Sequence, residues 1–406
     1  MIPFEEAKKI VLDTVHVLDP EEKDILEAQG MVLSENIMAD EDIPPFDNSA
    51  MDGYAVRSED VRSTSQNNPV SLKIVGDLPA GNVSDRIIEE GTAARIMTGA
   101  PVPAGADAVI MQEDTEEGGD CVKPRRAVRK GENIRPRGED IEKDEIVLKA
   151  GKLLKPADIG VLASLGIRKA KVIKRPRIGI LTTGNEVVEI EEPLIGGKIR
   201  NSNKYSLLSL MRSYHIDAVD LGIAQDDAGE IEEKIRKGLN NDILVTVGGV
   251  SVGKYDLVRT VLEKLGMETK FWKVAIKPGK PLLFGKLEKT IVFGLPGNTV
   301  SCVVSSELFI RPAIQKMSGR KPSDIQWVEA GLTRDVKVKG DRAVFLTANT
   351  ELHQGRYEAT PTAKQGSGKL STLSAANSLI LIPRGKREMA EKEVVGVLLF
   401  DSWYEY

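Results

Sequence analysis

Three glycine-rich turns in the second half of the chain carry the residue types that hold phosphate-bearing ligands. They span residues 182–186, 248–253 and 294–298, and each follows a predicted strand. Glycine lets backbone N–H groups approach an anion, and the N-terminus of a following helix adds a favourable field. We therefore predict ligand contacts from Gly184, Gly248, Gly249, Ser251, Gly253, Pro296, Gly297 and Asn298. The alternative is that these glycines only permit tight strand-to-helix turns.

Acidic side chains gather at the same turns, and lysines lie nearby in the sequence. The acids are Glu186, Asp226, Asp227 and Asp256, together with Asp52 and Asp140 in loops of the first half. The lysines are Lys273, Lys277 and Lys280. Carboxylates ligate hard cations such as Mg2+, and lysines neutralise oxyanions, so the set predicts a site for a divalent cation and an anion. Each acid alone could instead cap a turn, and the lysines could line a solvated strand edge.

One of these turns is similar to a nucleotide-binding loop. Residues 248–255 read GGVSVGKY, one residue short of a P-loop, between a predicted strand and a predicted helix. Tyr255 stands where a P-loop has the Ser or Thr that binds Mg2+, and its phenol cannot take that ligand position. The sequence therefore disfavours P-loop phosphotransfer, which stays an alternative.

The turns must be positioned by a sheet, and the pattern from residue 175 onward predicts one. Strands are expected at 177–181, 218–221, 243–247 and 291–293, and helices at 202–214, 227–239, 257–265 and 299–317. Alternation of this kind predicts a doubly wound α/β domain with a parallel sheet, in which ligands bind at the carboxyl ends of the strands.

The rest of the chain predicts three further units. The first 30 residues read as helical, with a second helix restarting at Pro20, and residues 70–128 read as short strands with a hairpin tip at Gly118 and Gly119. After residue 321 the period changes to two, which predicts a small all-β module. The expected domains are a discontinuous helical/β domain of residues 1–43 and 141–174, an inserted β-rich domain of 44–140, an α/β domain of 175–321 and a C-terminal domain of 322–406.

Composition excludes several function classes. A chain of 406 residues is expected to form about two to four domains. The net charge of -5 and an aromatic content of 4% argue against a protein that binds nucleic acid through phosphates or stacked bases. Two cysteines and three histidines, all scattered, offer neither a disulfide framework nor zinc-site spacing.

The N-terminal residues do not form a targeting signal, and no segment reads as membrane-spanning. Glu5 and Glu6 lie where a signal peptide would be basic, and the longest uncharged stretch, 290–306, is broken by Gly294, Pro296 and Gly297. We therefore expect a cytoplasmic protein that binds neither membrane nor nucleic acid.

Seven motifs together resemble those of the molybdopterin molybdenumtransferases, the MoeA-type enzymes that also occur as the E domain of gephyrin. They are residues 44–55 (PPFDNSAMDGYA), 95–101 (RIMTGAP), 135–141, 183–186, 248–253, 276–281 and 294–298. The resemblance runs through the whole chain in order, and the first two motifs are long enough to be specific.

The resemblance implies a fold and a reaction. The fold would be an elongated homodimer of four-domain subunits, each with an α/β molybdopterin-binding domain and a small C-terminal β-barrel. The active site would lie between the α/β domain of one subunit and the β-rich domain of the other. The reaction would convert adenylyl-molybdopterin and molybdate, or tungstate, to molybdenum cofactor and AMP with Mg2+. Further partners implied are a molybdopterin adenylyltransferase and proteins that mature molybdoenzymes.

The resemblance also assigns site residues. Its acidic positions fall on Asp52, Asp140, Glu186, Asp226 and Asp256, and we expect Glu186, Asp226 and Asp256 to bind the metal. Further family positions fall on Thr98, Lys273, Lys277 and Ser367. Two residues depart from the family pattern, because Lys254 replaces a common acid and Thr299 replaces a common Pro. A scaffold role would predict extra linkers or fused domains, and a molybdopterin adenylyltransferase would be expected without the first 170 residues and the C-terminal module.

Overall fold

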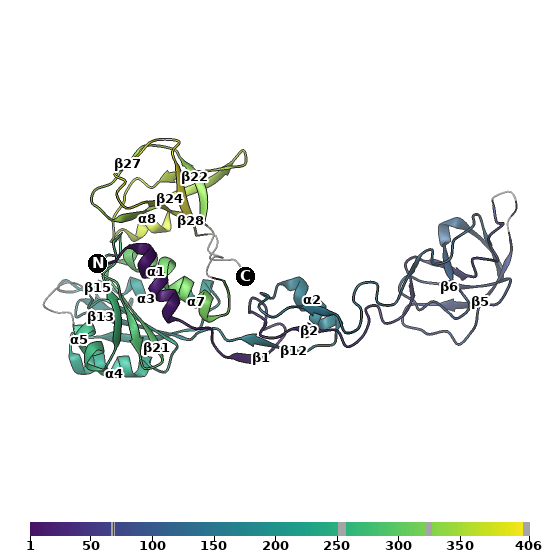
Figure 1. The fold of residues 1–406 in the computed structure, drawn as a ribbon, viewed down its shortest axis with the longest axis horizontal. Helices are drawn as coiled ribbons and strands as arrows, with labels where there is room; N and C mark the ends of the chain where they lie inside the picture. The colour runs from purple at the N-terminus through teal and green to yellow at the C-terminus, as the bar shows by residue number, and fades with distance from the viewer. Residues whose placement is uncertain (66–67, 69, 251–256, 322–326, 401–406) are drawn as a thin grey trace.

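The computed structural model describes residues 1–65, 68, 70–250, 257–321 and 327–400. The chain is elongated (Figure 1). An α/β unit and a C-terminal β unit lie together at one end, a small helical/β unit lies in the middle, and a β-rich unit occupies the far end. This arrangement confirms the expected multidomain α/β plus β fold. Among the described residues, no helix is long and apolar enough to cross a membrane.

The α/β unit is built on one six-stranded sheet with the order β16-β13-β17-β21-β20-β18. Its strands are β13 (Ile178–Thr183), β16 (Ala218–Ala224), β17 (Ile243–Val247), β18 (Glu268–Trp272), β20 (Leu283–Leu287) and β21 (Thr290–Leu295). The first four strands in this order are parallel, as expected, but β20 and β18 pair antiparallel. Only Glu288 and Lys289 separate β20 from β21, and so short a connection can join only antiparallel neighbours. The four strands predicted from the sequence are therefore the parallel ones, and the two antiparallel edge strands were not predicted.

Helices cover both faces of this sheet, which confirms the doubly wound arrangement. They are α3 (Ser202–Ser213), α4 (Ala228–Gly238), α5 (Leu257–Lys264), α6 (Thr299–Ser305) and α7 (Arg311–Met317), with the π-helical turn η2 (Ser306–Ile310) between the last two. One core joins α3, α6 and α7 to the sheet through residues such as Ile180 and Leu308, and the other joins α4 and α5 through Leu181 and Val258.

Helix α1 (Phe4–Thr14) packs on the same α/β core. Its buried residues Phe4, Ala7 and Val11 form one apolar face, and the Phe4 ring meets the Phe309 ring edge-on with 5.7 Å between centroids. The expected domain limits placed residues 1–43 in the discontinuous unit. These domain limits stay a prediction. Helix α1, which they assign to the discontinuous unit, packs instead into the core of the α/β unit.

The helix predicted to restart at Pro20 is a strand, so that prediction was wrong. Strand β1 (Pro20–Asp24) pairs antiparallel with β12 (Lys169–Ile173), and Glu22 forms an ion pair with Lys169 at 3.1 Å. The segment carries charged side chains instead of an apolar helical stripe, so backbone pairing with β12 decides its conformation. This two-stranded ribbon links the α/β unit to the middle unit (Figure 1).

The middle and far units carry the remaining elements of the first half. The middle unit contains β2 (Ile37–Met38), β11 (Ile146–Leu148) and α2 (Pro156–Ser164). The far unit has a six-stranded sheet made of β4 (Gly53–Val56), β5 (Leu72–Leu78), β6 (Thr92–Ile96), β7 (Ala108–Met111), β8 (Thr115–Gly118) and β9 (Cys121–Pro124). Beside it lie β3 (Asn48–Ser49), β10 (Ile134–Arg135) and the 3-10 turn η1 (Gln112–Asp114). Strands β8 and β9 form the hairpin expected at Gly118 and Gly119.

The C-terminal unit is a closed barrel. Its strands are β22 (Trp327–Leu332), β24 (Ala343–His353), β25 (Arg356–Pro361), β26 (Ser378–Ile382) and β28 (Val394–Leu399). Strand β24 pairs with both β25 and β26, and β28 pairs with both β22 and β26. The ring closes because β22 also pairs with β25. The shorter elements of the second half are β14 (Val187–Val188), β15 (Ile199–Arg200), β19 (Ile276–Lys277), β23 (Val336–Lys337), β27 (Glu388–Met389) and α8 (Leu370–Ser374).

Candidate active site

A large cleft lies between the α/β unit and the C-terminal barrel. Its volume is ≈ 890 Å³, and strand-end turns of the sheet and loops of the barrel line it. Seven residues expected from the sequence are among its lining residues: Gly249, Lys277, Lys280, Pro296, Gly297, Asn298 and Ser367. The fold therefore brings together residues that lie more than a hundred positions apart in the chain.

The side chains that line this cleft are strongly basic. The cations are Lys277, Lys280, Arg334, Lys337, Lys339 and Arg342, and the one acid among the described lining residues is Asp335. A cleft lined by one sign of charge concentrates ligands of the opposite sign. The four cations from residues 334–342 were missed by the sequence analysis, because nothing in the local sequence shows which face of the barrel meets the α/β unit.

The barrel holds the lysine segment in place through its backbone. Strand β19 pairs with β24, with Ile276 opposite Ala343 and Lys277 opposite Val344. The Nη1 of Arg342 also donates to the carbonyl oxygen of Ile276 at 3.0 Å. These bonds fix the backbone that presents the exposed Lys277, so the barrel positions a residue that the α/β unit contributes.

A second backbone contact ties the barrel to the start of helix α6. The N–H of Val300 donates to the carbonyl oxygen of Ser367 at 3.0 Å. On the other side of the turn, Nδ2 of Asn203 donates to the carbonyl oxygen of Gly297 at 2.7 Å. The α/β unit therefore holds the 294–298 turn at Gly297, and the barrel holds the start of the helix that follows it.

The turn after β13 places Glu186 and Asp226 in neighbouring loops. At Gly184 φ is +137°, and a Cβ atom there would lie 2.6 Å from Oε2 of Glu186, so glycine lets this carboxylate fold over the turn. The N–H of Asp226 donates to Oδ1 of Asn185 at 2.9 Å, and the N–H of Asn185 donates to Oδ2 of Asp226 at 3.3 Å. The two acid-bearing loops are thereby fastened to each other.

Gly248 and Gly249 connect this acidic turn to the basic cleft. Their φ values are +93° and +62°, and a Cβ atom on Gly248 would lie 2.5 Å from the carbonyl oxygen of Thr183. Only glycine fits where the two turns approach so closely. Gly249 lines the cleft, whereas neither Glu186 nor Asp226 is among the lining residues.

The expected metal ligands are only partly within the described residues. Ser251, Gly253, Lys254 and Asp256 lie outside them. The described part of the chain contains no group of three or more His, Cys, Asp or Glu side chains arranged to hold a metal ion. Glu186 and Asp226 nevertheless suit Mg2+, which in enzymes is commonly held by one or two carboxylates together with substrate phosphates and water.

Asp52 lies in the far β-rich unit and is bound to Thr98. Its Oδ1 accepts hydrogen bonds from the backbone N–H and the hydroxyl of Thr98, both at 2.7 Å. These bonds, the backbone one first, hold the pKa of the Asp52 carboxyl below its usual value. The exposed carboxylate is therefore charged and held in one orientation. Asp140 lies in a separate loop, where its N–H donates to the carbonyl oxygen of Ile43 at 3.0 Å.

Within one chain, Asp52 and Glu186 do not meet. Asp52 immediately precedes β4, which pairs with β6, and Glu186 follows β13 by three residues. Figure 1 shows β6 and β13 at opposite ends of the elongated molecule. A single chain therefore separates the two acid groups that the sequence analysis assigned to one site.

Lys273 takes a position different from that of the other lysines. Its Nζ lies 3.8 Å from the centroid of the Trp272 ring, and the guanidinium carbon of Arg259 lies 4.2 Å from the same centroid. Both cations are attracted to the ring electrons. Lys273 is not among the residues that line the cleft.

Comparisons with known proteins match the whole chain. Family models match residues 2–166 (MoeA N-terminal region, domain I and II), 179–316 (probable molybdopterin binding domain) and 329–400 (MoeA C-terminal region, domain IV). The molybdopterin molybdenumtransferase of Haemophilus influenzae is 35% identical over 99% of both chains, and that of Staphylococcus aureus strain MRSA252 is 33% identical over 99% of this chain and 96% of its own. A crystal structure of the molybdopterin biosynthesis moeA protein from Pyrococcus horikoshii OT3 is 35% identical and superimposes with a TM-score of 0.82 over 98% of this chain and 100% of that one.

Proposed function

The chain belongs to the molybdopterin molybdenumtransferase family, a transferase of molybdenum cofactor biosynthesis, and from that premise we propose its reaction in full. It inserts molybdate into adenylyl-molybdopterin and releases AMP, with Mg2+ as cofactor. The observation that carries this proposal is the basic cleft of ≈ 890 Å³. Its size falls within the range of small-molecule sites, and its charge suits an anionic nucleotide together with an oxyanion.

The lysines and arginines of the cleft bind the negative groups of the substrates. Lys277 and Lys280 neutralise the molybdate dianion, and Arg342, already bonded to the Ile276 carbonyl, adds a third positive charge at the same wall. Tungstate is a tetrahedral dianion of similar size, so the same three residues bind it. The 294–298 turn, which Asn203 holds at the carbonyl oxygen of Gly297, orients the adenylylated substrate beside them.

The carboxylates bind the positively charged and hydrogen-bond-donating groups, which the lysines and arginines cannot bind. Glu186 and Asp226 supply oxygen ligands for Mg2+ and acceptors for pterin N–H groups. When bound, Mg2+ would neutralise charge on the phosphoanhydride as AMP leaves. The tethering of Asn185 to Asp226 keeps both carboxylates at the edge of the sheet where the cleft opens.

The active site is shared between two subunits of a homodimer. Asp52 and Thr98 of one subunit complete the site formed by Glu186 and the cleft of the other. The separation of these groups along one chain supports the proposal, because no internal movement of a strand or loop would bring them together (Figure 1). A two-fold dimer then holds two equivalent sites.

The alternatives differ in chain organisation and in products. A molybdopterin adenylyltransferase would not be expected to contain the regions of residues 2–166 and 329–400 that the MoeA models match. P-loop phosphotransfer would move a phosphate to an acceptor without needing an oxyanion. Tyr255, which argues against it, lies outside the described residues.

The proposed reaction predicts AMP release that depends on both Mg2+ and an oxyanion. Purified protein is incubated with adenylyl-molybdopterin, with and without Mg2+, and with molybdate, tungstate or neither, and AMP is measured by chromatography. AMP is expected in quantity only when Mg2+ is present and either oxyanion is added. Turnover that ignores the oxyanion and transfers phosphate would contradict the proposal and favour the P-loop alternative.

A further inference from the structure

The side chain of Trp272 ties one wall of the basic cleft to the edge strand β18. Its Nε1 donates to the carbonyl oxygen of Val250 at 3.2 Å. Val250 and Gly249 line the cleft, whereas Trp272 is not among the described lining residues. The indole therefore holds the 248–250 segment from the side that faces away from the cleft.

This hydrogen bond fixes the direction of the Val250 carbonyl. The side chain of Val250 is anchored separately, since it is 1% exposed and a Cβ atom on Gly294 would lie 2.7 Å from its Cγ1. The oxygen of a peptide group is the negative end of a dipole. If the Val250 carbonyl turned toward the cleft, it would repel an anion bound there. The bond to Trp272 prevents that turn.

Lys273 lies over the ring of the neighbouring Trp272, with 3.8 Å between Nζ and the ring centroid. Neighbouring side chains of a strand point to opposite faces, so this contact needs a departure from strand geometry. Lys273 follows the last residue of β18, and its φ of +133° provides that departure. A positive φ is uncommon outside glycine and persists where the surroundings hold it. Here the N–H of Lys273 donates to the Leu282 carbonyl at 3.2 Å, and its own carbonyl accepts from the N–H of Ile2 at 3.1 Å.

A cation over the face of an indole makes the N–H of that ring a stronger donor. The ammonium attracts the electrons of the ring, which leaves more positive charge on the N–H proton. Arg259 lies over the same ring at 4.2 Å, but it is also paired with Glu263 at 2.8 Å, so part of its charge is offset. The charge of Lys273 therefore acts on Val250 through the indole, although Lys273 is not among the described lining residues of the cleft.

We propose that Lys273 and Trp272 act together as a positioning pair for the reaction. Lys273 strengthens the indole N–H, and the indole holds the Val250 carbonyl away from the anion that binds in the cleft. Neither residue of the pair contacts the substrate. The inference rests on the proposed function for its ligand, because AMP is the product of that reaction. It gives Lys273 a role different from that of Lys277 and Lys280, which bind the oxyanion directly.

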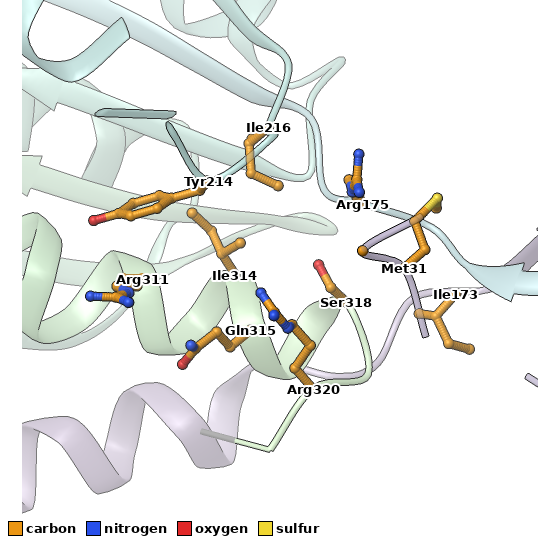
Figure 2. Close-up of a pocket in the computed structure, with 11 residues that line it drawn as sticks. Met31, Ile173, Arg175, Tyr214, Ile216, Arg311, Ile314, Gln315, Ser318 and Arg320 are labelled. Carbon is orange, nitrogen blue, oxygen red and sulfur yellow. The ribbon is translucent and has the colours of Figure 1, made fainter. Parts of the chain in front are cut away.

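A smaller cavity elsewhere in the molecule does not compete for this ligand. It lies where the ribbon of β1 and β12 enters the α/β unit, and Figure 2 shows the side chains around it. Its volume is ≈ 60 Å³, and one water needs roughly 10–15 Å³, so it has space for a few waters. A nucleotide does not fit there.

The first test observes the indole N–H directly and needs no ligand. The chain contains three tryptophans, so protein grown with isotope-labelled tryptophan gives three side-chain N–H resonances, and Trp272→Phe identifies that of Trp272. Lys273→Gln is expected to move this resonance upfield, because the hydrogen bond to Val250 weakens. Lys270→Gln, which changes an exposed lysine of the same strand, is the matched control and should leave all three resonances in place. An unmoved Trp272 resonance in Lys273→Gln would overturn the proposal.

The second test is a double-mutant cycle on AMP binding, measured by calorimetry. Trp272→Phe keeps a ring for Lys273 but removes the N–H, and it is expected to weaken AMP binding about fivefold, as loss of one hydrogen bond does. Lys273→Gln alone should weaken binding by about two- to fivefold. In the Trp272→Phe background, Lys273→Gln should have no further effect beyond that of Lys270→Gln. A Lys273 that contacts AMP directly would weaken binding by the same factor in both backgrounds, which would overturn the proposal.

Thermal unfolding of each variant separates these effects from a loss of folding. If Trp272→Phe does not fold, the resonance test still decides, because Trp327→Phe and Trp403→Phe identify the other two signals. Absence of AMP release or AMP binding in the unmutated protein would contradict the proposed function. The resonance test would then judge the positioning pair on its own.

Discussion

Asp52→Asn is expected to slow AMP release by about a hundredfold or more while the free energy of unfolding stays nearly unchanged. The Asp52 carboxylate is exposed and held by two hydrogen bonds from Thr98, which lower its pKa and keep it charged at neutral pH. Asparagine has the same shape and keeps one oxygen that accepts these bonds. The substitution therefore removes the charge at the proposed site and little else.

Asp47→Asn is the matched control for this substitution. Asp47 is also an exposed loop acid of the same unit, and its Oδ1 accepts a backbone hydrogen bond from Arg137 at 2.7 Å. Initial rates of AMP release and thermal unfolding are measured for both variants. If Asp52→Asn unfolds early, or if both variants lose activity equally, Asp52 acts on the structure of the loop and not on the reaction.

The pair Lys277→Ala and Lys280→Ala is expected to lower kcat/KM for molybdate by about a hundredfold or more. A hydrogen bond to a charged group contributes about 1.5–3 kcal/mol, so losing two corresponds to at least about two powers of ten. Most of the loss should appear as a raised KM for the oxyanion, since the lysines bind it before and during the reaction. Steady-state kinetics with molybdate as the varied substrate measure both constants.

The control for the lysine pair removes the same number of positive charges from residues outside the cleft. Lys286 and Lys289 lie in and just after β20, outside the residues that line the cleft. Lys286 is half-buried and Lys289 is exposed. Lys286→Ala with Lys289→Ala should leave kcat/KM within about twofold of the unmutated protein, since neither lysine lines the cleft. An equal loss in both double variants would show that general charge, and not the cleft, governs oxyanion use.

The sequence predicted the parts of the fold that depend on local pattern. The strands that end in the 182–186 and 294–298 turns are where they were expected, because buried strands and Gly-rich turns leave a signal within a few residues. The edge strands β20 and β18 and the ribbon of β1 and β12 were missed. Their conformations depend on pairing partners, and for β1 the partner lies about 150 residues away in the chain.

In the candidate site, too, the residues in local motifs were predicted, and those placed by contacts distant in the chain were not. Lys277, Lys280 and the three turns were predicted because their residue types occur together in short motifs. Arg334 and Arg342 were not, since their role depends on how the closed barrel docks on the α/β unit and pairs β24 with β19. The position of Lys273 against the Trp272 ring likewise follows from a side-chain contact that spacing does not reveal.

The sharing of one active site between two subunits is tested most directly with a mixed dimer. Subunits carrying Asp52→Asn and subunits carrying Glu186→Gln are co-expressed with different tags, and the dimer that carries both tags is purified. One of its two sites contains both substitutions and the other contains neither, so the account predicts about half of the unmutated rate of AMP release from two parents that are each nearly inactive. A mixed dimer that stays as inactive as its parents, with both subunits folded, would show that Asp52 and Glu186 act within one chain and would contradict the account.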